Sequence, residues 1–382
     1  MSSSTQKFLP PSSASFHHFE KTASQALNRL EASSRALDEK LSLIEEKLSL
    51  IDEKSSILQK QISIYSEVAL KDNKEETSFD TRVRLFSLLP EATGQLRKCQ
   101  KATSKLMKAL GEILDKNNIE YWFGYGSLLG AYTRQSPIPW DDDIDICMHR
   151  SGLEKLMKIL EDSQEYQVTK IYDWYVRCIQ YRFCSKDYYL PSFIDIGVWD
   201  YATEYSEAKD ERLRQLRLEL MDEFNKASLP YWDERKLLFA TKGKQIISAT
   251  QIVEPETQDK KRSRKDISVI EGLFDKYIQK AYDEGIFCNE DESSSYAYSF
   301  DNLYMPKRQM LFDKKLIHPT VKIPYEGFEV SCPKKTKDFL DTCYSSWPYI
   351  PNDSSLIRGG HINNIIIENP LAEAAMNKFI AD

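Results

Sequence analysis

The sequence lacks the patterns that mark zinc-thiolate, disulfide-rich and membrane-spanning proteins. Its seven cysteines are odd in number and scattered, without C-x-x-C spacing, which argues against a zinc site and a disulfide framework. No run approaches the roughly 18 apolar residues that a membrane-spanning helix needs, and residues 1–19 contain no continuous apolar signal segment. We therefore expect a soluble cytoplasmic protein, able to act peripherally at the inner face of a membrane.

An excess of basic residues is also missing. The formal net charge is −7, whereas a general nucleic-acid binder needs a basic surface for its phosphate contacts, so no nucleic-acid partner is expected. The histidines, among them His149, His318 and His361, are too scattered to suggest a metal site. The 382 residues, 41% of them hydrophobic, are enough for two or three structural units.

The first of these units is a predicted coiled coil. Residues 1–18 are rich in Ser and Pro and are expected to be disordered. In residues 19–65, apolar side chains recur every seven positions, and the segments DEKLSLI, EEKLSLI and DEKSSIL follow one another from position 38. This pattern predicts a coiled-coil helix that joins copies of the chain into a homo-oligomer. A third apolar column leaves open a dimer, a larger oligomer, or packing on the chain's own catalytic domain.

A polar segment over 66–84 reads as a linker, and residues 85–382 are long enough for one catalytic domain. At the centre of this domain stands Tyr121–Met148, YWFGYGSLLGAYTRQSPIPWDDDIDICM. We predict a β-prone run, a turn at Gly124–Ser127, a Pro-bounded loop, and a second strand from Asp143 to Met148. On a strand, Asp143 and Asp145 would point to one face because side chains alternate with period two.

Two carboxylates on one face repel each other unless a cation lies between them. Hard oxygen ligands suit Mg²⁺ or Mn²⁺, which bind through one or two carboxylates together with substrate phosphates. The motif therefore predicts a divalent-metal site at Asp143 and Asp145 and a phosphoryl-transfer type of chemistry. The alternative is a solvated acidic turn.

The Gly-Ser turn followed by the Asp-x-Asp strand is similar to the nucleotidyltransferase-fold signature, and LLGA…IPWDDDIDI resembles the LicD family, which includes fukutin-related enzymes. The resemblance implies an α+β fold with a nucleotidyltransferase-like mixed sheet flanked by helices, here preceded by the coiled-coil helix. It also implies transfer of phosphocholine or a polyol phosphate from a CDP-linked donor to a glycan or a lipid-linked glycan acceptor.

The same resemblance implies roles for further residues. A substrate-binding set is expected at Gly126, Ser127, Arg134, Trp140 and Asp142.

A third carboxylate is expected at Asp195, which interrupts the apolar run FIDIG over 193–197 and is costly to bury without a partner. Asp195 would bind metal or accept the proton of the attacking hydroxyl, as the third carboxylate of nucleotidyltransferase-like sites does. The alternative is an Asp that caps a turn.

The remaining segments predict helices and strands around this centre. Helices are expected over 96–117, 152–161, 204–226, 268–283 and 334–344, and strands over 174–183, 296–300, 303–312 and 328–331. The basic run 260–265 is either a solvated loop or a site for an anionic ligand.

Three functions compete at this point. The first is a metal-dependent phosphotransferase with a CDP-linked donor, in which Asp143, Asp145 and Asp195 are catalytic. The second is a nucleotidyltransferase that uses an NTP and releases pyrophosphate. The third is a non-catalytic coiled-coil assembly protein, against which the complete set of three aspartates argues.

Overall fold

The computed structural model describes residues 40, 71, 75–173, 177–187, 189–230, 232, 259–303, 309–344, 347–348 and 370–382. The chain divides into two compact units, Met1–Ser78 and Phe79–Asp382. The coiled coil expected over 19–65 and the disorder expected over 1–18 lie outside the described residues, so both stay predictions. The second unit contains the predicted catalytic domain.

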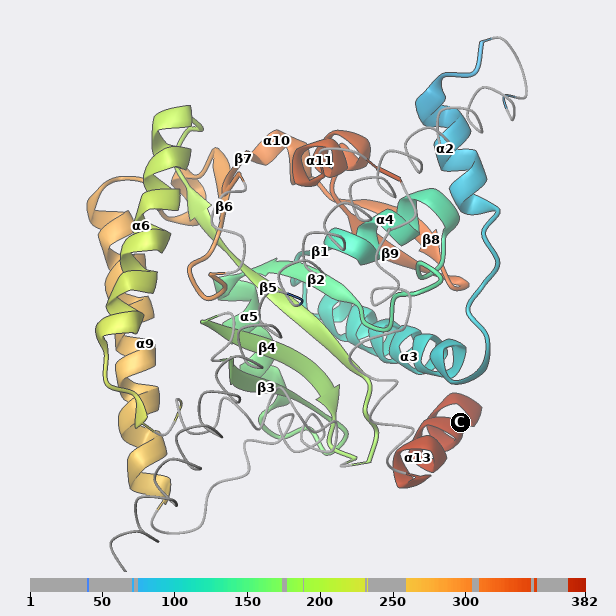
Figure 1. Ribbon diagram of the computed structural model, residues 1–382, viewed down its shortest axis with the longest axis horizontal. Coiled ribbons are helices and arrows are strands. Elements are labelled where there is room, and N and C mark those ends of the chain that lie inside the picture. The colour runs from blue at the N-terminus through green and yellow to red at the C-terminus, as the bar shows by residue number, and fades with distance from the viewer. Residues whose placement is uncertain are drawn as a thin grey trace, which may run out of the picture. The chain divides into compact units, whose positions relative to one another are not determined.

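This unit is built on a mixed, seven-stranded sheet, which confirms the predicted α+β class (Figure 1). Its strands run in the order β1-β2-β5-β4-β3, with β6 and β7 added beside the second half of β5. The pair β2–β5 is parallel, and the other pairs are antiparallel. The strands are β1 Tyr121–Phe123, β2 Asp145–His149, β3 Tyr166–Asp173, β4 Cys178–Ser185, β5 Phe193–Ala202, β6 Ser295–Tyr298 and β7 Leu311–Asp313.

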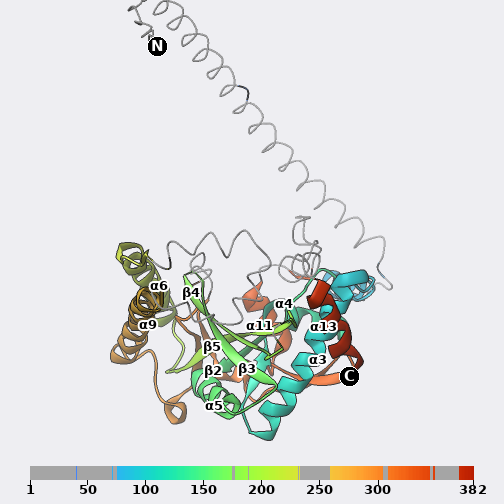
Figure 2. The ribbon, with the colours of Figure 1, turned by 90° about the horizontal axis from the view of Figure 1, so that it is seen from below.

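Helices pack around this sheet, and a separate hairpin of β8 Val321–Tyr325 and β9 Phe328–Cys332 lies against β1. Figures 1 and 2 both show α6 beside α9 and α13 beside α3. The helices are α2 Ser78–Ser87, α3 Gly94–Lys116, α4 Tyr125–Arg134, α5 Arg150–Leu160, α6 Glu207–Lys226, α9 Asp259–Asp283, α10 Lys314–Ile317, α11 Thr336–Cys343 and α13 Pro370–Ala381, with a 3-10 turn at Glu290–Glu292.

The core follows from the apolar patterns of these elements. In α3, Leu106, Leu110 and Leu114 recur every four residues on one helix face, and all three are fully buried, as their spacing predicts. Strand β5 is central and has neighbours on both edges, so nearly all of its side chains are buried or half-buried. Asp195 therefore stands on a strand in the interior of the sheet, at a half-buried position.

The fold corrects three local predictions. The Gly-Ser segment is not a free turn, because Tyr125 already begins α4. The second strand begins at Asp145, so Asp143 belongs to the loop before it rather than to the strand. The basic run 260–265 is not a loop, because its backbone forms the first turns of α9.

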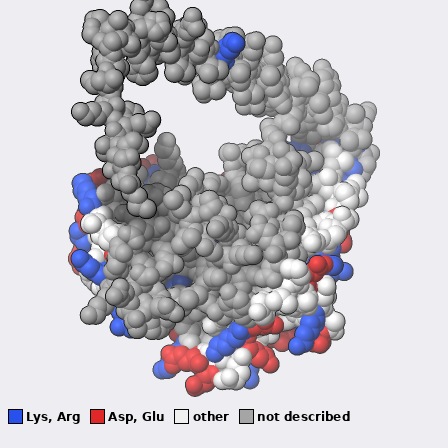
Figure 3. Space-filling view, turned by 60° about the horizontal axis from the view of Figure 1, so that its bottom comes forward, with Lys and Arg blue, Asp and Glu red and all other residues white. Residues whose placement is uncertain are grey.

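The surface carries charges of both signs. Figure 3 shows basic and acidic side chains next to one another along the described part of one face. Among the helices that the structure describes, none combines the length and apolar character needed to cross a membrane.

Candidate active site

Three aspartates come together near the first residues of β2 and β5, in the middle of the sheet. Carboxylate oxygens of Asp143, Asp145 and Asp195 all lie within 4.8 Å of one another, and each of the three residues is half-buried. The structure thus brings together the three residues for which the sequence predicts a shared metal. Like charges this close raise one another's free energy unless a cation compensates them.

The strand register of the sheet fixes the positions of two of the three aspartates, Asp145 and Asp195. Strands β2 and β5 run parallel with Asp145 opposite Asp195, and the amide of Asp195 donates to the carbonyl of Ile144 at 2.9 Å. The amide of Gly124 donates to the carbonyl of Asp145 at 3.1 Å, which fixes the other side of β2. A slip of one residue would turn either carboxylate to the opposite face of the sheet.

A fourth carboxyl group, which the sequence analysis did not single out, stands beside the three. Burial, together with the charges of Asp143 and Asp145, raises the pKa of Asp141 well above its usual value, and its carboxyl group hydrogen-bonds that of Asp143. A Cβ atom at Gly126 would lie 2.7 Å from Oδ2 of Asp141, so a larger residue there would force this carboxyl group to shift. Gly126 thus borders the acidic cluster directly.

The amino end of α4 faces the same region. Gly124 caps the helix without a side-chain hydrogen bond, and the first hydrogen bond of the helix runs from the amide of Leu128 to the carbonyl of Gly124, at 2.9 Å. The Oγ of Ser127 accepts a hydrogen bond from the amide of Asp145 at 2.8 Å, which ties the helix to β2. Free amides at a helix start favour an anion, so phosphate and metal can meet here.

The loop that carries the aspartates is held from two sides. Gly130 of α4 touches it so closely that a Cβ atom there would lie 2.6 Å from the carbonyl oxygen of Ser136. From α3, the side-chain amide of Gln100 donates to the carbonyls of Ile138 and Asp141, at 3.0 and 2.8 Å. Gly130, the glycine of the LLGA motif, is therefore needed for a steric reason: a side chain there would collide with the backbone of the acidic loop.

Arg182 of β4 supplies a positive charge next to the aspartates. It pairs with Asp195 across the antiparallel strands, and its Nε donates to Oδ1 of Asp195 at 2.7 Å. Its guanidinium group also lies 3.9 Å from the ring centroid of Phe193. The sequence analysis did not identify Arg182, although an Asp in an apolar strand signals that a partner is needed.

The other predicted site residues lie further from the trio or face elsewhere. Arg134 stands at the far end of α4, where it donates to Ser136 Oγ and to the carbonyl of Leu89, both at 3.0 Å. Trp140 packs edge-on against Phe86. Asp142 is buried, and its charge, after burial itself, helps to raise the pKa of the Cys99 thiol to about 12.

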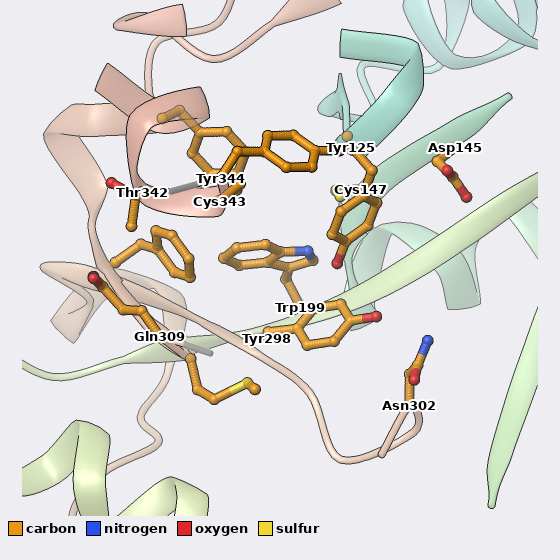
Figure 4. A pocket seen from close by; sticks show the side chains of 14 residues that line it. Tyr125, Asp145, Cys147, Trp199, Tyr298, Asn302, Gln309, Thr342, Cys343 and Tyr344 are labelled. Atoms are coloured by element: carbon orange, nitrogen blue, oxygen red, sulfur yellow. The ribbon is translucent and has the colours of Figure 1, made fainter. Parts of the chain in front are cut away.

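A pocket of about 350 Å³ opens next to Asp145 (Figure 4). Its polar lining includes the side chains of Asn302 and Gln309, and among the described residues that line it there is no lysine or arginine. Six of the fourteen residues that line it are aromatic: Tyr125, Trp199, Tyr298, Phe312, Phe339 and Tyr344. The aromatic segment 296–300, which the sequence analysis expected near the site, thus contributes Tyr298. Aromatic walls suit an apolar, planar or cationic group.

A buried arginine fixes one wall of this pocket. Arg217 of α6 donates to the carbonyls of Tyr298, Ser299 and Asn302, and burial lowers its pKa to about 10. The positive charge of Arg217 is thus stabilised by backbone dipoles of the segment 298–302. These contacts position Tyr298 and Asn302, which come from far along the chain and could not be assigned from local patterns.

Comparisons with known proteins agree with this geometry. Residues 118–222 match the family model of the LicD/FKTN/FKRP nucleotidyltransferase domain. Two uncharacterised proteins are similar in part: one of Rickettsia prowazekii, 44% identical over 70 residues (18% of this chain, 26% of the relative), and one of Rickettsia typhi, 57% identical over 50 residues (13% and 16%).

A third relative is named for an enzymatic activity. It is the lipopolysaccharide cholinephosphotransferase LicD of Haemophilus influenzae, 26% identical over 121 residues, which cover 28% of this chain and 44% of the relative. The chain thus spans less than half of the length of each of these relatives. The resemblance expected from the sequence is confirmed, since residues 118–222 match the model of the LicD/FKTN/FKRP nucleotidyltransferase domain.

Proposed function

We propose that the chain transfers a substituted phosphate, such as phosphocholine or a polyol phosphate, from a CDP-linked donor to a sugar hydroxyl of a glycan or a lipid-linked glycan. The family match and the Haemophilus relative suggest a phosphotransferase-type function. The observation that carries the proposal is the meeting of Asp143, Asp145 and Asp195 within 4.8 Å. A cluster of three carboxylates is suited to a divalent cation that also binds a diphosphate.

The residues present fit a divalent cation. Three carboxylates converge, a fourth is held next to them with a raised pKa, and all of these groups offer hard oxygen donors. We propose Mg²⁺ or Mn²⁺, held by Asp143, Asp145 and Asp195. Such an ion would bind oxygens of the donor diphosphate and neutralise part of their charge.

The chain's own residues orient the reactants. The amides at the start of α4, at Gly126 and Ser127, face the donor phosphates, and the hydroxyl of Ser127 keeps the backbone of Asp145 in place. The sugar oxygen forms a bond to phosphorus while the bond from phosphorus to the oxygen of CMP breaks, and CMP leaves. The hydroxyl proton passes to a carboxylate oxygen of the cluster, from which it exchanges with water. Orientation and charge compensation supply most of the acceleration.

The proposal is tested by incubating the full chain with labelled CDP-choline, CDP-ribitol and CTP, each with Mg²⁺ or Mn²⁺ and a glycan acceptor. Release of CMP from a CDP compound, dependent on metal and on acceptor, is the expected result. Release of pyrophosphate from CTP instead would establish the nucleotidyltransferase alternative and contradict the transfer of a substituted phosphate. The variant Asp145→Asn is the control for a contaminating hydrolase.

A further inference from the structure

We propose that Arg182 binds a phosphate oxygen of the donor through the terminal nitrogens of its guanidinium group and stabilises the charge of the group in transfer. The hydrogen bond from Arg182 to Asp195 then orients the guanidinium group toward the donor. This inference rests on the proposed function and adds a substrate-contacting residue to it. It assigns to β4 a part of the site that neither the sequence motif nor the carboxylate cluster contains.

Three contacts fix the direction of the Arg182 side chain. Its backbone stands opposite that of Asp195, its Nε donates to Asp195 Oδ1 at 2.7 Å, and its guanidinium group lies 3.9 Å from the centroid of the Phe193 ring. The side chain is 10% exposed, so little freedom remains to it. An arginine held this way has already lost most of its conformational entropy before a ligand binds.

The terminal nitrogens of Arg182 remain available. The single hydrogen bond from its side chain to a described residue uses Nε. Nη1 and Nη2 are not among the fully buried side-chain atoms that lack a hydrogen-bond partner. Two donors of a planar fork therefore reach solvent beside the cluster. Phosphate oxygens are the acceptors that match such a fork, and a bond to a charged oxygen is about twice as strong as a neutral one.

A donor phosphate that binds beside the three carboxylates needs a positively charged group to offset their repulsion. Asp143, Asp145 and Asp195 attract a divalent cation but repel the phosphates of the donor. Arg182 forms an ion pair with one member of this trio, so its charge lies at the point where donor phosphate and carboxylates meet. In the transfer step, negative charge is spread over the equatorial oxygens of the phosphoryl group, and a fixed guanidinium group stabilises it without reorganisation.

The experiment compares Arg182→Gln and Arg182→Lys with the wild-type full chain. We expect kcat for the CDP-linked donor to fall about 100-fold in Arg182→Gln. Arg182→Lys should retain part of the activity because it keeps the charge but loses the fork. The affinity for Mn²⁺ alone should stay within about threefold, because the three carboxylates are intact. The matched control is Arg212→Gln, which breaks ion pairs with Glu219 on α6 and with Glu284 just after α9 and should keep full activity.

A binding measurement keeps the inference independent of the donor's identity. Calorimetric titration with inorganic pyrophosphate, in the presence of saturating Mg²⁺, should show binding to the wild type and at least about tenfold weaker binding to Arg182→Gln. Equal pyrophosphate affinity of the two, or no pyrophosphate binding to the wild type, overturns the inference. So does a loss of Mn²⁺ affinity in Arg182→Gln with kcat restored at high Mn²⁺, since Arg182 would then only orient Asp195. If the wild type binds pyrophosphate through Arg182 but turns over no CDP compound, the proposed function fails and the inference stands.

Discussion

At the scale of single residues, the site depends on side chains whose charges conflict. Asp141, Asp143 and Asp145 raise one another's energy, and the raised pKa of Asp141 records this conflict. The interior of the sheet shows the opposite solution at His149, which is only 3% exposed and stacks on Tyr201 with ring centroids 4.0 Å apart. Here the charge is avoided rather than compensated.

The burial of His149 predicts a pH dependence of stability. Burial first, and then the nearby charges of Lys314 and His318, lower the pKa of His149 to about 3. The unfolded chain binds this proton near pH 6.5, so between these pH values the unfolded state holds more protons. The free energy of unfolding should therefore fall as the pH decreases below about 6.5, by up to about 1.4 kcal/mol per pH unit from this residue alone.

Chemical denaturation of the wild type and of His149→Gln between pH 7 and pH 5 checks this expectation. The variant cannot titrate at this position, so its stability should depend less steeply on pH than that of the wild type. Parallel curves for the two proteins would show that His149 makes no contribution.

At the scale of elements, the site is the place where α4, the acidic loop and β2 pass one another. Tyr125 begins α4 with a φ of 46°, a left-handed conformation that is rare for a non-glycine residue and costs on the order of 1–3 kcal/mol. Gly130 then allows the loop to cross the helix, and Gln100 of α3 holds the loop from the other side. The position of Asp143, which lies outside the strand, depends on these contacts.

We expect Gly130→Ala to displace the acidic loop. The added methyl group would lie 2.6 Å from the carbonyl oxygen of Ser136 and 3.2 Å from the amide nitrogen of Ile138, both of them backbone atoms. A shift of about 1 Å in a catalytic group can lower turnover about 100-fold, and we predict a loss of this order together with weaker Mn²⁺ binding.

The control is Gly272→Ala in α9. No atom lies within 4 Å of a Cβ atom at Gly272, and the residue is exposed within the helix. Alanine should raise the free energy of unfolding by up to about 1 kcal/mol and leave turnover unchanged. If Gly130→Ala were as active as Gly272→Ala, the steric account of the LLGA glycine would be wrong.

Local patterns were enough to predict most of the elements and to single out the three aspartates that the structure brings together. The period of α3 identified its buried leucines, and the apolar run over 193–197 identified Asp195 as a carboxylate that needs a partner. They were not enough for Arg182, Tyr298 or Asn302. Strand pairing places Arg182 at the site, and the contacts of Arg217 place Tyr298 and Asn302 there. Local patterns do not reveal these contacts, because they join residues that are distant in the sequence. The strand boundary at Asp145 also escaped prediction, because alternation alone does not show where pairing begins.

At the scale of the whole molecule, the chain joins the unit that contains the acidic cluster to an N-terminal segment with a heptad pattern. The pattern predicts an oligomer through residues 19–65. The two units are distinct in the structure, with the boundary at Ser78. The acidic site lies within the second unit alone, so oligomerisation and metal binding should be separable.

Deletion of residues 1–77 should lower the molar mass of the particle measured by light scattering and leave Mn²⁺ affinity unchanged. Ile44→Asp together with Ile51→Asp in the full chain should have the same effect on mass, because both positions belong to the predicted apolar seam. Ser49→Asp, outside the seam, is the control. An unchanged mass in the deletion and in the double variant would show that this segment does not join the copies.

The central claim is that Asp143, Asp145 and Asp195 are brought together to hold a divalent cation against a diphosphate. Calorimetric titration of the full chain with Mn²⁺, with and without CDP-choline or CDP-ribitol, tests it most directly in the wild type and in Asp145→Asn. We predict that the wild type binds Mn²⁺, more tightly with a CDP compound present, and that Asp145→Asn weakens this binding at least about 100-fold while the metal-free variant is no less stable. Equal Mn²⁺ binding by the two proteins, or no binding by the wild type, would contradict the account.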